Sequence, residues 1–442
     1  MKMRTVWSAV LAMATAAASA QGPVSLSLKQ ALDMAAKQAY TVQNSELEAE
    51  KSRHQVKEIT AMGLPQINGE GSMTNYIDVP TQIIPNFIGE GPAYIPVQFG
   101  VPHSMTGSLS LNQLLFDGSY IVGLQASRAV AKRSEDELEK ARTDARNQAA
   151  KAYYGALAAD EGARLVSQGV PLLEKSLAEA QAMLSAGFME RTDVDRVTVQ
   201  LEQARVQERE FRRQADIARM MLALTLGLPQ GTPMVLTDEL AALLRDPAEI
   251  ALVEEPFVRD NHIDLVIADD LVRLQSLSLR NEKVKQLPSL NGFFNHQQVW
   301  NGPTFDPGGE YQFYPTTLWG LTLRVPIISS GMRYHRVAQA RQALQQAEVN
   351  RTFTEQQLLT ELERQRGNVR TATENLLAEQ RNLDLATEIV DRTALKFANG
   401  AASSFELTQE QSNLLVAQQR FVQSIARLAN ARAELRLALD LY

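Results

Sequence analysis

The chain contains an internal duplication, which limits its possible folds more than any other feature. The segment 64–69 (LPQING) returns as 287–292 (LPSLNG), and 186–188 (AGF) matches 399–401 (NGA) in the second half. A repeat has to be recognised before local patterns are interpreted, because each copy forms one structural unit. We therefore expect a first structural repeat at 21–227 and a second at 257–442. They are joined by a linker at 228–256 that contains four prolines.

Both halves end in a segment with a heptad pattern. Apolar residues predominate at alternating steps of three and four from Val194 to Leu222 in the first half and from Leu407 to Leu435 in the second. A 3.5-residue period held over about four heptads indicates coiled-coil packing. Many seam positions are Ala, so the expected helices can approach one another closely.

Two longer segments, 119–185 and 332–398, precede these heptads. They contain no proline except Pro171 and are rich in Ala, Glu, Gln, Arg and Leu, which favour helices. Each would extend about 100 Å as a continuous helix. A chain of 442 residues otherwise suggests about three compact domains. Helices this long instead predict a protein that spans a distance.

Each half also carries two strand-like segments between its helical parts. Apolar and other residues alternate along the last of them, and the apolar face, expected to be lipid-facing, holds Trp319, Leu321, Leu323 and Val325. Residues Met105, Gly107, Leu109 and Leu111 alternate with polar ones in the same way, whereas the segments 65–79 and 287–300 show the weaker alternation typical of outer-membrane barrels. The four expected strands lie at about 65–79, 103–117, 287–300 and 314–326.

The strand number constrains the assembly. The segments 80–102 and 301–315, rich in Pro, Gly and aromatic residues, are expected to be connecting loops. Four strands cannot close a barrel, for which about eight is the smallest common number. The barrel must therefore be shared between subunits.

The first 20 residues have the pattern of a signal peptide. Lys2 and Arg4 precede a short apolar segment rich in Ala, and 18–20 (ASA) offers a cleavage site. The apolar segment is shorter than the roughly 20 residues that a membrane-spanning helix needs. We therefore expect residues 1–20 to direct export and the mature chain to start near Gln21.

Composition and spacing argue against several functions. With 44 Lys and Arg, 51 Asp and Glu, and a net charge of −7, the chain shows no basic stripe for nucleic acid. It has no Cys, and its five His residues are scattered without the spacing of a zinc motif. We expect no catalytic site, no metal site and no cofactor.

Several of these features resemble the outer membrane efflux protein (TolC) family. They are the signal peptide, the twofold helix-strand-strand-helix repeat, 114–118 (LLFDG), 326–331 (PIISSG) and the tip segments 183–188 and 397–401. The resemblance covers essentially the whole mature chain. It implies an α+β membrane protein in which a homotrimer builds a shared 12-stranded transmembrane β-barrel and a long coiled-coil α-helical tunnel. The linker 228–256 would lie in the equatorial belt of that tunnel.

The resemblance also implies a function. Members of the family are passive exit ducts in the cell outer membrane of Gram-negative bacteria, with the helical tunnel in the periplasm. They serve tripartite efflux or type I secretion systems. The expected partners are two further copies of the chain, a periplasmic adaptor (membrane fusion) protein, indirectly an inner-membrane pump, and outer-membrane lipid.

Site residues follow from the same resemblance. The positions that match the periplasmic gate and entrance are Asp193, Phe397 and Glu406. The positions that match the adaptor-contacting tips are Ala186, Gly187, Phe188, Asn399, Gly400 and Ala401. Ala402 and Gln409 depart from the pattern, since the best-known member has an Arg and an Asp there. In the alternative interpretation, Asp193 and Glu406 are ordinary first-turn carboxylates favoured by a helix N-terminus.

Three other functions are weighed against the duct. A periplasmic adaptor would have one coiled-coil hairpin flanked by β-rich domains, whereas this chain repeats helix-strand-strand-helix twice. An elongated periplasmic scaffold without a pore would leave the alternating strands unexplained. An enzyme comes last, because the sequence shows no pattern of an active site.

Overall fold

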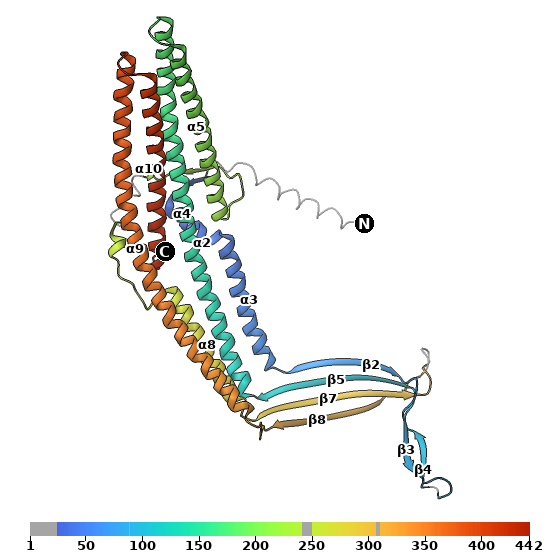
Figure 1. Ribbon diagram of the computed structural model, residues 1–442. Coiled ribbons are helices and arrows are strands. Elements are labelled where there is room, and N and C mark those ends of the chain that lie inside the picture. Colours follow the sequence, from blue (N-terminus) through green and yellow to red (C-terminus); the bar gives the residue numbers. More distant parts are fainter. Residues whose placement is uncertain (1–23, 88, 241–249, 306–309) are drawn as a thin grey trace, which may run out of the picture. The chain divides into compact units, whose positions relative to one another are not determined.

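The chain divides into two units (Figure 1). The structure, a computed structural model, describes residues 24–87, 89–240, 250–305 and 310–442. The expected signal peptide at 1–20 lies outside these residues, as does part of the expected linker. The helical unit consists of the described residues up to Ala49, Ser134–Asp269 and Asn350–Tyr442, and the sheet unit of Glu50–Arg133 and Asp270–Val349.

Helices make up most of the chain. The helices are α2 (Leu28–Gln38), α3 (Tyr40–Met62), α4 (Gly118–Ser185), α5 (Arg191–Thr225), the 3-10 helix η1 (Leu252–Glu254), α8 (Ile263–Val284), α9 (Met332–Ala398) and α10 (Ser404–Ala438). The strands are β1 (Val24–Leu26), β2 (Gln66–Asn75), β3 (Thr81–Pro85), β4 (Tyr94–Gln98), β5 (His103–Phe116), β6 (Met234–Leu236), β7 (Ser289–Gly302) and β8 (Tyr314–Arg324). None of the described helices is both long and apolar enough to cross a membrane.

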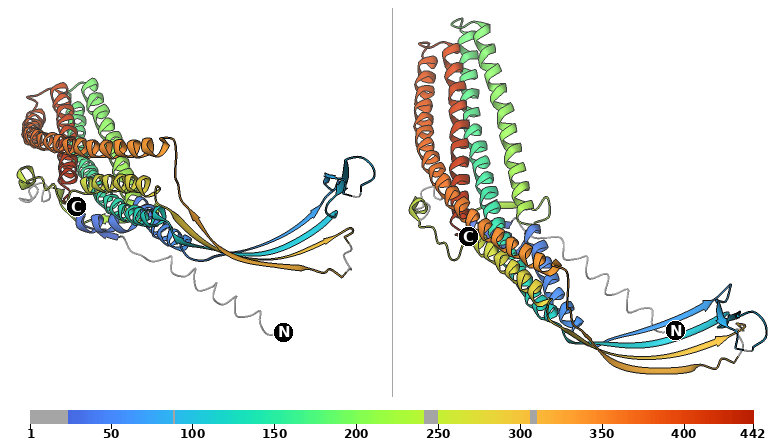
Figure 2. Two further views of the ribbon diagram at one scale, coloured as in Figure 1. Left: turned by 90° about the horizontal axis from the view of Figure 1, so that it is seen from below. Right: turned by 60° about the horizontal axis from the view of Figure 1, so that its bottom comes forward.

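In the helical unit, α5 and α10 run beside the parts of α4 and α9 that belong to this unit (Figures 1 and 2). Their heptad seams are buried, and each fully buried Leu or Val contributes about 1.5–3 kcal/mol. The buried seam residues include Val197, Leu201, Leu222, Leu407, Leu428 and Leu435. Gly162 of α4 faces Phe211 and Val422, and a Cβ there would lie 3.0 Å from the Phe211 ring. Glycine therefore lets α5 and α10 pack closely on α4.

A second part of this unit gathers around Tyr153 of α4, whose side chain is fully buried. Its hydroxyl donates to the backbone oxygen of Leu26 and lies 2.9 Å from Oδ2 of Asp238. Burial, together with the adjacent Asp238, raises the pKa of this phenol. Strands β1 and β6, which flank these residues, pair in parallel. Gly227 has a φ of 72° and lies against the C-terminal end of α2. A Cβ there would be 2.1 Å from the backbone oxygen of Gln38, so only glycine fits this close approach.

The sheet unit holds a four-stranded antiparallel sheet in the order β2-β5-β7-β8. The two strands of each half are therefore neighbours, and β5 and β7 join the halves. Strands β2 and β8 each have one neighbour in the described residues, so their outer edges stay open. Open edges are sites where further strands can pair.

The segment 80–102 differs from the connecting loop expected from its sequence. It forms a separate two-stranded hairpin, in which β3 and β4 pair antiparallel from Thr81↔Gln98 to Pro85↔Tyr94. Its many Pro and Gly residues suggested a loop, but Ile83, Ile84, Ile95 and Val97 favour strands. A proline inside a helix removes one backbone hydrogen bond. Pro171 nevertheless lies within α4, which continues from Gly118 to Ser185.

Candidate functional site

Two helix-hairpin tips carry most of the expected site residues: the first joins α4 to α5 and the second joins α9 to α10. Gly187 and Gly400 adopt φ values of 81° and 72°, which glycine reaches without strain. At the first tip the N–H of Phe188 donates to the oxygen of Met183 at 2.9 Å. The equivalent bond from Ala401 to Lys396 measures 2.8 Å. Both turns therefore close in the same way, as Schellman motifs.

Outside these turns, the expected tip residues differ in exposure. Phe188, which follows Gly187, is 86% exposed. The corresponding Ala401 offers only a methyl group, and Ala186, Asn399 and Gly400 are also exposed. Within the turns themselves, only the first therefore presents a large apolar side chain, whereas at the second tip the exposed Phe405 belongs to the first turn of α10.

Phe397 does not face solvent. It is 1% exposed and packs in a core that joins the two hairpins. The other buried members of this tip core are Ala180, Val194, Val197 and Leu407. Ala402, one of the positions that departs from the family pattern, packs against the same core. In this chain the aromatic ring therefore holds the α4–α5 and α9–α10 hairpins together.

Asp193 lies in the first turn of α5 and contacts the other hairpin. Its Oδ1 accepts a 2.5 Å hydrogen bond from Oγ of Ser404, the first residue of α10, and lies 3.4 Å from a guanidinium nitrogen of Arg196. Ser404 is buried, which strengthens a hydrogen bond to a carboxylate. Sequence reasoning missed Ser404, because its importance depends on a contact with a residue 211 positions away.

Glu406 forms a local contact instead. Its Oε2 accepts a hydrogen bond from the N–H of Ser403 at 3.1 Å, while Oγ of Ser403 accepts from the N–H of Glu406 at 3.1 Å. This capping box satisfies two free donors at the start of α10. Gln409, the other departing position, bonds Asn413 on the same helix. Glu406 thus stabilises the start of α10 through this capping box.

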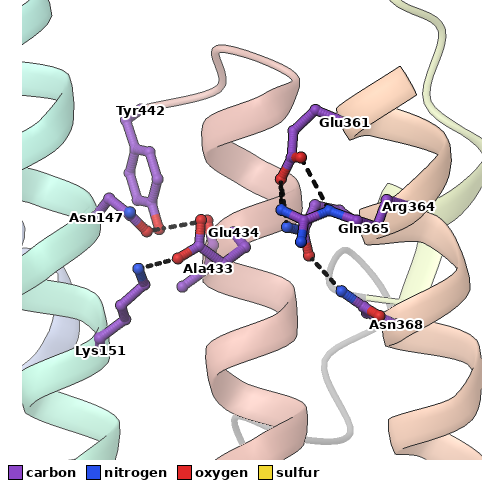
Figure 3. A network of polar contacts seen from close by, with 9 residues as sticks. All are labelled: Asn147, Lys151, Glu361, Arg364, Gln365, Asn368, Ala433, Glu434 and Tyr442. Atoms are coloured by element: carbon purple, nitrogen blue, oxygen red, sulfur yellow. Dashed lines mark hydrogen bonds and ion pairs between the residues drawn. The ribbon is translucent and has the colours of Figure 1, made fainter. Parts of the chain in front are cut away.

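A polar network connects three helices farther along the same unit (Figure 3). Lys151 of α4 forms an ion pair with Glu434 of α10. On α9, Glu361 accepts hydrogen bonds from Arg364 and Gln365, and the bond from Arg364 holds the pKa of the Glu361 carboxyl below its usual value. A groove of about 610 Å³ lies between α9 and α10, and its polar lining includes Arg364, Asn368, Asn375, Arg427, Asn430 and Glu434.

The four-stranded sheet has one apolar and one polar face. Paired residues of neighbouring strands share a face, so the register gives complete rows across the sheet. One row contains Ile67, Leu111, Phe294 and Trp319, and the Trp319 side chain is 77% exposed. A polar row on the opposite face contains Glu70, Ser108, Gln297 and Thr316.

The expected lipid-facing residues belong to the apolar face. Leu321 and Leu323 share that face with Trp319, and Val325 lies just beyond the end of β8; all are exposed. Sequence reasoning identified the alternation of Met105, Leu109 and Leu111 in β5, but it missed the apolar residues of β2 and β7, where glycines and polar residues interrupt the alternation. Among the described residues, no set of three or more His, Asp and Glu side chains is placed to hold a metal ion.

Comparison with known proteins gives a consistent result. Residues 31–228 and 276–440 match the sequence profile of the outer membrane efflux protein family. No curated protein matches the chain.

Among solved structures, the chain is similar to CusC, at 16% identity and a TM-score of 0.70, over 96% of this chain and 95% of that one. It is similar to the open state of the Neisseria gonorrhoeae MtrE outer membrane channel, at 16% identity and a TM-score of 0.69, over 93% and 88% of the two chains. VceC from Vibrio cholerae is similar at 14% identity and a TM-score of 0.66, over 93% and 95%. At these identities the similarity establishes the fold.

Proposed function

The chain belongs to the outer membrane efflux protein family, and from this we propose that three copies form a passive exit duct through the outer membrane. The family consists of transport channels and not of enzymes. In the proposed duct, the sheets of three copies form one barrel and the helices form a tunnel in the periplasm. The observation that carries the proposal is a sheet with one apolar and one polar face and two open edges.

The sheet supports a shared barrel. A lipid-exposed sheet cannot leave edge N–H and C=O groups unpaired, because the hydrocarbon core contains no water to bind them. Pairing β8 of one copy with β2 of the next would satisfy both edges, and three copies would supply twelve strands. The rows described above would then place apolar side chains toward lipid and polar ones toward the lumen.

The helical unit supports contact between copies as well. Besides its buried seam, α5 has an exposed apolar patch on the opposite side near its C-terminal end, where helical spacing brings four residues together. They are Ile217, Met220, Met221 and Leu224. A helix that is apolar on two sides normally has neighbours on both. The polar groove between α9 and α10 is the kind of surface that suits a water-filled tunnel.

The tips are the proposed gate and docking site. Asp193 and Ser404 would hold the two hairpins of one copy together in a closed state, with Phe397 packed beneath them. Three copies of Glu406 would form an acidic ring that favours cations at the entrance. The exposed tips, with Phe188 and Phe405 as large apolar contacts, would receive a periplasmic adaptor.

The system around the duct completes the proposal. Channels of this family work with an adaptor and an inner-membrane pump, so a pump would supply the work and the adaptor would connect pump and duct. This arrangement fits a tripartite efflux or type I secretion system in a Gram-negative bacterium. The alternative of a periplasmic scaffold without a pore is disfavoured by the exposed apolar face of the sheet, which would meet water.

Planar-bilayer recording tests the proposal. We expect the purified protein to insert and to conduct ions weakly at rest, because the contact between Asp193 and Ser404 would hold the tips closed. Replacing both Asp193 and Glu406 by Ala is expected to raise the conductance or weaken the preference for cations. A double variant with unchanged conductance and selectivity would remove the gate and leave the duct. Absence of any current from either protein would contradict the duct.

A further inference from the structure

The two connections at one end of the four-stranded sheet differ in how far their aromatic residues are exposed. In the second half, the connection that follows β7 packs its rings on the sheet: Tyr311 meets Trp300 edge-on at 4.7 Å and stacks with Phe305 at 5.9 Å. Trp300 is only 8% exposed as a result. In the first half, Phe87, Tyr94 and Phe99 remain exposed, Phe87 by 82%. The described rings of the second connection are thus less exposed than those of the first, since Phe305 and Phe313 are 39% and 38% exposed.

The exposed residues of the first connection form a defined surface. We call residues 76–102 the outer hairpin; its strands β3 and β4 pair only with each other among the described residues. The register places Ile83 opposite Pro96 and Pro85 opposite Tyr94 on one face, and Ile83 and Tyr94 are both largely exposed there. The opposite face also carries apolar residues, Ile84, Ile95 and Val97, but these are half-buried. An isolated two-stranded hairpin is marginally stable in water. An apolar face on such a hairpin therefore indicates a partner surface.

The edges of the outer hairpin are not suited to strand addition. Pro85 and Pro96 lie within β3 and β4, and proline has no N–H to donate to an added strand. The partner must therefore meet the side chains of the apolar face.

Charge narrows the identity of the partner. The outer hairpin contains Asp78 and Glu90 and no Lys, Arg or His. Phosphate-rich lipid headgroups attract basic side chains, so this surface is poorly suited to a membrane surface. A nearly uncharged apolar face can meet an identical face without repulsion. The hairpin also directly follows β2, the edge strand at which another copy would join the sheet.

We propose that the outer hairpin is a contact between copies of this chain. In the trimer, the apolar faces around Ile83 and Tyr94 of the three hairpins pack on one another and form a cap over the outer mouth of the barrel. This inference rests on the proposed trimeric duct. It adds to the duct a second site of subunit contact, beyond the paired strand edges.

Spin-label distances test where the hairpins lie. The natural chain has no Cys, so one introduced Cys gives one label per copy. In a threefold assembly, the distance between equivalent labels grows with their distance from the symmetry axis. We expect a shorter distance for Phe87→Cys than for the control Leu321→Cys on the apolar face of the sheet. A longer distance for Phe87→Cys would mean that the hairpins lie outward on lipid, and a very broad distribution that they are unpartnered; either would overturn the inference.

A pair of charge variants tests the contact itself. Ile83→Glu places a carboxylate on the apolar face, whereas Gln82→Glu places one on the opposite face of the same strand. We expect Ile83→Glu to lower the temperature at which the trimer dissociates by at least several degrees, and Gln82→Glu to leave it unchanged. Equal shifts would contradict a contact through this face. A monomeric protein with no distance between labels at either position would instead refute the proposed trimer.

Discussion

The two helix-hairpin tips share one backbone turn but differ in how the following helix begins. At the second tip, Ser403 and Glu406 form a capping box, so α10 satisfies its own first turn. At the first tip, the N-cap residue Glu190 makes no side-chain cap, and Asp193 bonds Ser404 of the other hairpin. The start of α10 is therefore capped by residues of its own tip, whereas the start of α5 has no side-chain cap and is bonded to the other hairpin.

The same difference recurs in the sheet unit. The connection after β7 packs its own aromatic rings, and the outer hairpin after β2 leaves its rings exposed. The two halves are thus similar in backbone but differ in their contacts. The second half caps its helix and packs its aromatic rings with its own residues, whereas the first half has a helix start bonded to the other hairpin and aromatic rings that stay exposed.

The two tip phenylalanines should differ most. Phe397→Ala removes a ring from the tip core, and such substitutions cost about 3–5 kcal/mol. Phe188→Ala removes an exposed ring and should change the free energy of unfolding by less than about 0.5 kcal/mol. Chemical denaturation followed by circular dichroism measures both. Similar losses in the two variants would mean that the tips are not distinct in the way described.

Removing the hydrogen bond between the two hairpins should have the next largest effect. Ser404→Ala removes a hydrogen bond to a carboxylate, an interaction of about 1.5–3 kcal/mol, which corresponds to a shift of about ten-fold or more in a two-state equilibrium. We expect a higher open probability in planar-bilayer recordings. Asp195→Ala is the control, because Asp195 is an exposed acid on α5, two residues from Asp193. If both variants behave like the natural protein, the Asp193–Ser404 bond does not hold the tip closed.

Exchanging the caps should reverse the difference between the tips. Ser403→Ala removes the capping box and should destabilise the start of α10 by about 1 kcal/mol. Glu190→Ser supplies the missing cap at the first tip and should protect the start of α5 by a similar amount. Hydrogen exchange of the first-turn amides reports each end separately. No gain in protection in Glu190→Ser would show that the first tip lacks more than a cap.

A substitution with little expected effect on stability distinguishes the two interpretations of Glu406, as an entrance charge or as a helix cap. Gln can replace Glu in a capping box, so Glu406→Gln should keep stability within about 0.5 kcal/mol while removing the charge. An acidic entrance ring predicts reduced cation selectivity in this variant. Unchanged selectivity would leave Glu406 with the capping role alone.

The sequence carries the long-range plan of this fold because its patterns are periodic. The heptads from Val194 and Leu407 locate the packed helices, and the alternation from Trp319 to Leu323 locates a strand and its apolar face. The glycines at 187 and 400 mark the turns because only the left-handed backbone region closes them without strain. Such features depend on neighbouring residues and can be read locally.

The remaining features depend on contacts between distant residues. The bond between Asp193 and Ser404, and the position of Phe397 inside the tip core, require two hairpins to be packed together. Ile67 and Phe294 share the apolar face with Leu111 only through the register of the strands. Strand propensity in the outer hairpin was masked by its prolines and glycines. No periodic signal in the sequence could have revealed these relations.

Native mass spectrometry of the detergent-extracted protein tests the central claim most directly. One chain, with residues 1–20 included, has a mass of 48.9 kDa. We predict an assembly of three copies, because a four-stranded sheet with two open edges needs neighbours on both sides to close a barrel. A folded protein with the mass of a single copy would contradict the shared barrel and the duct built on it.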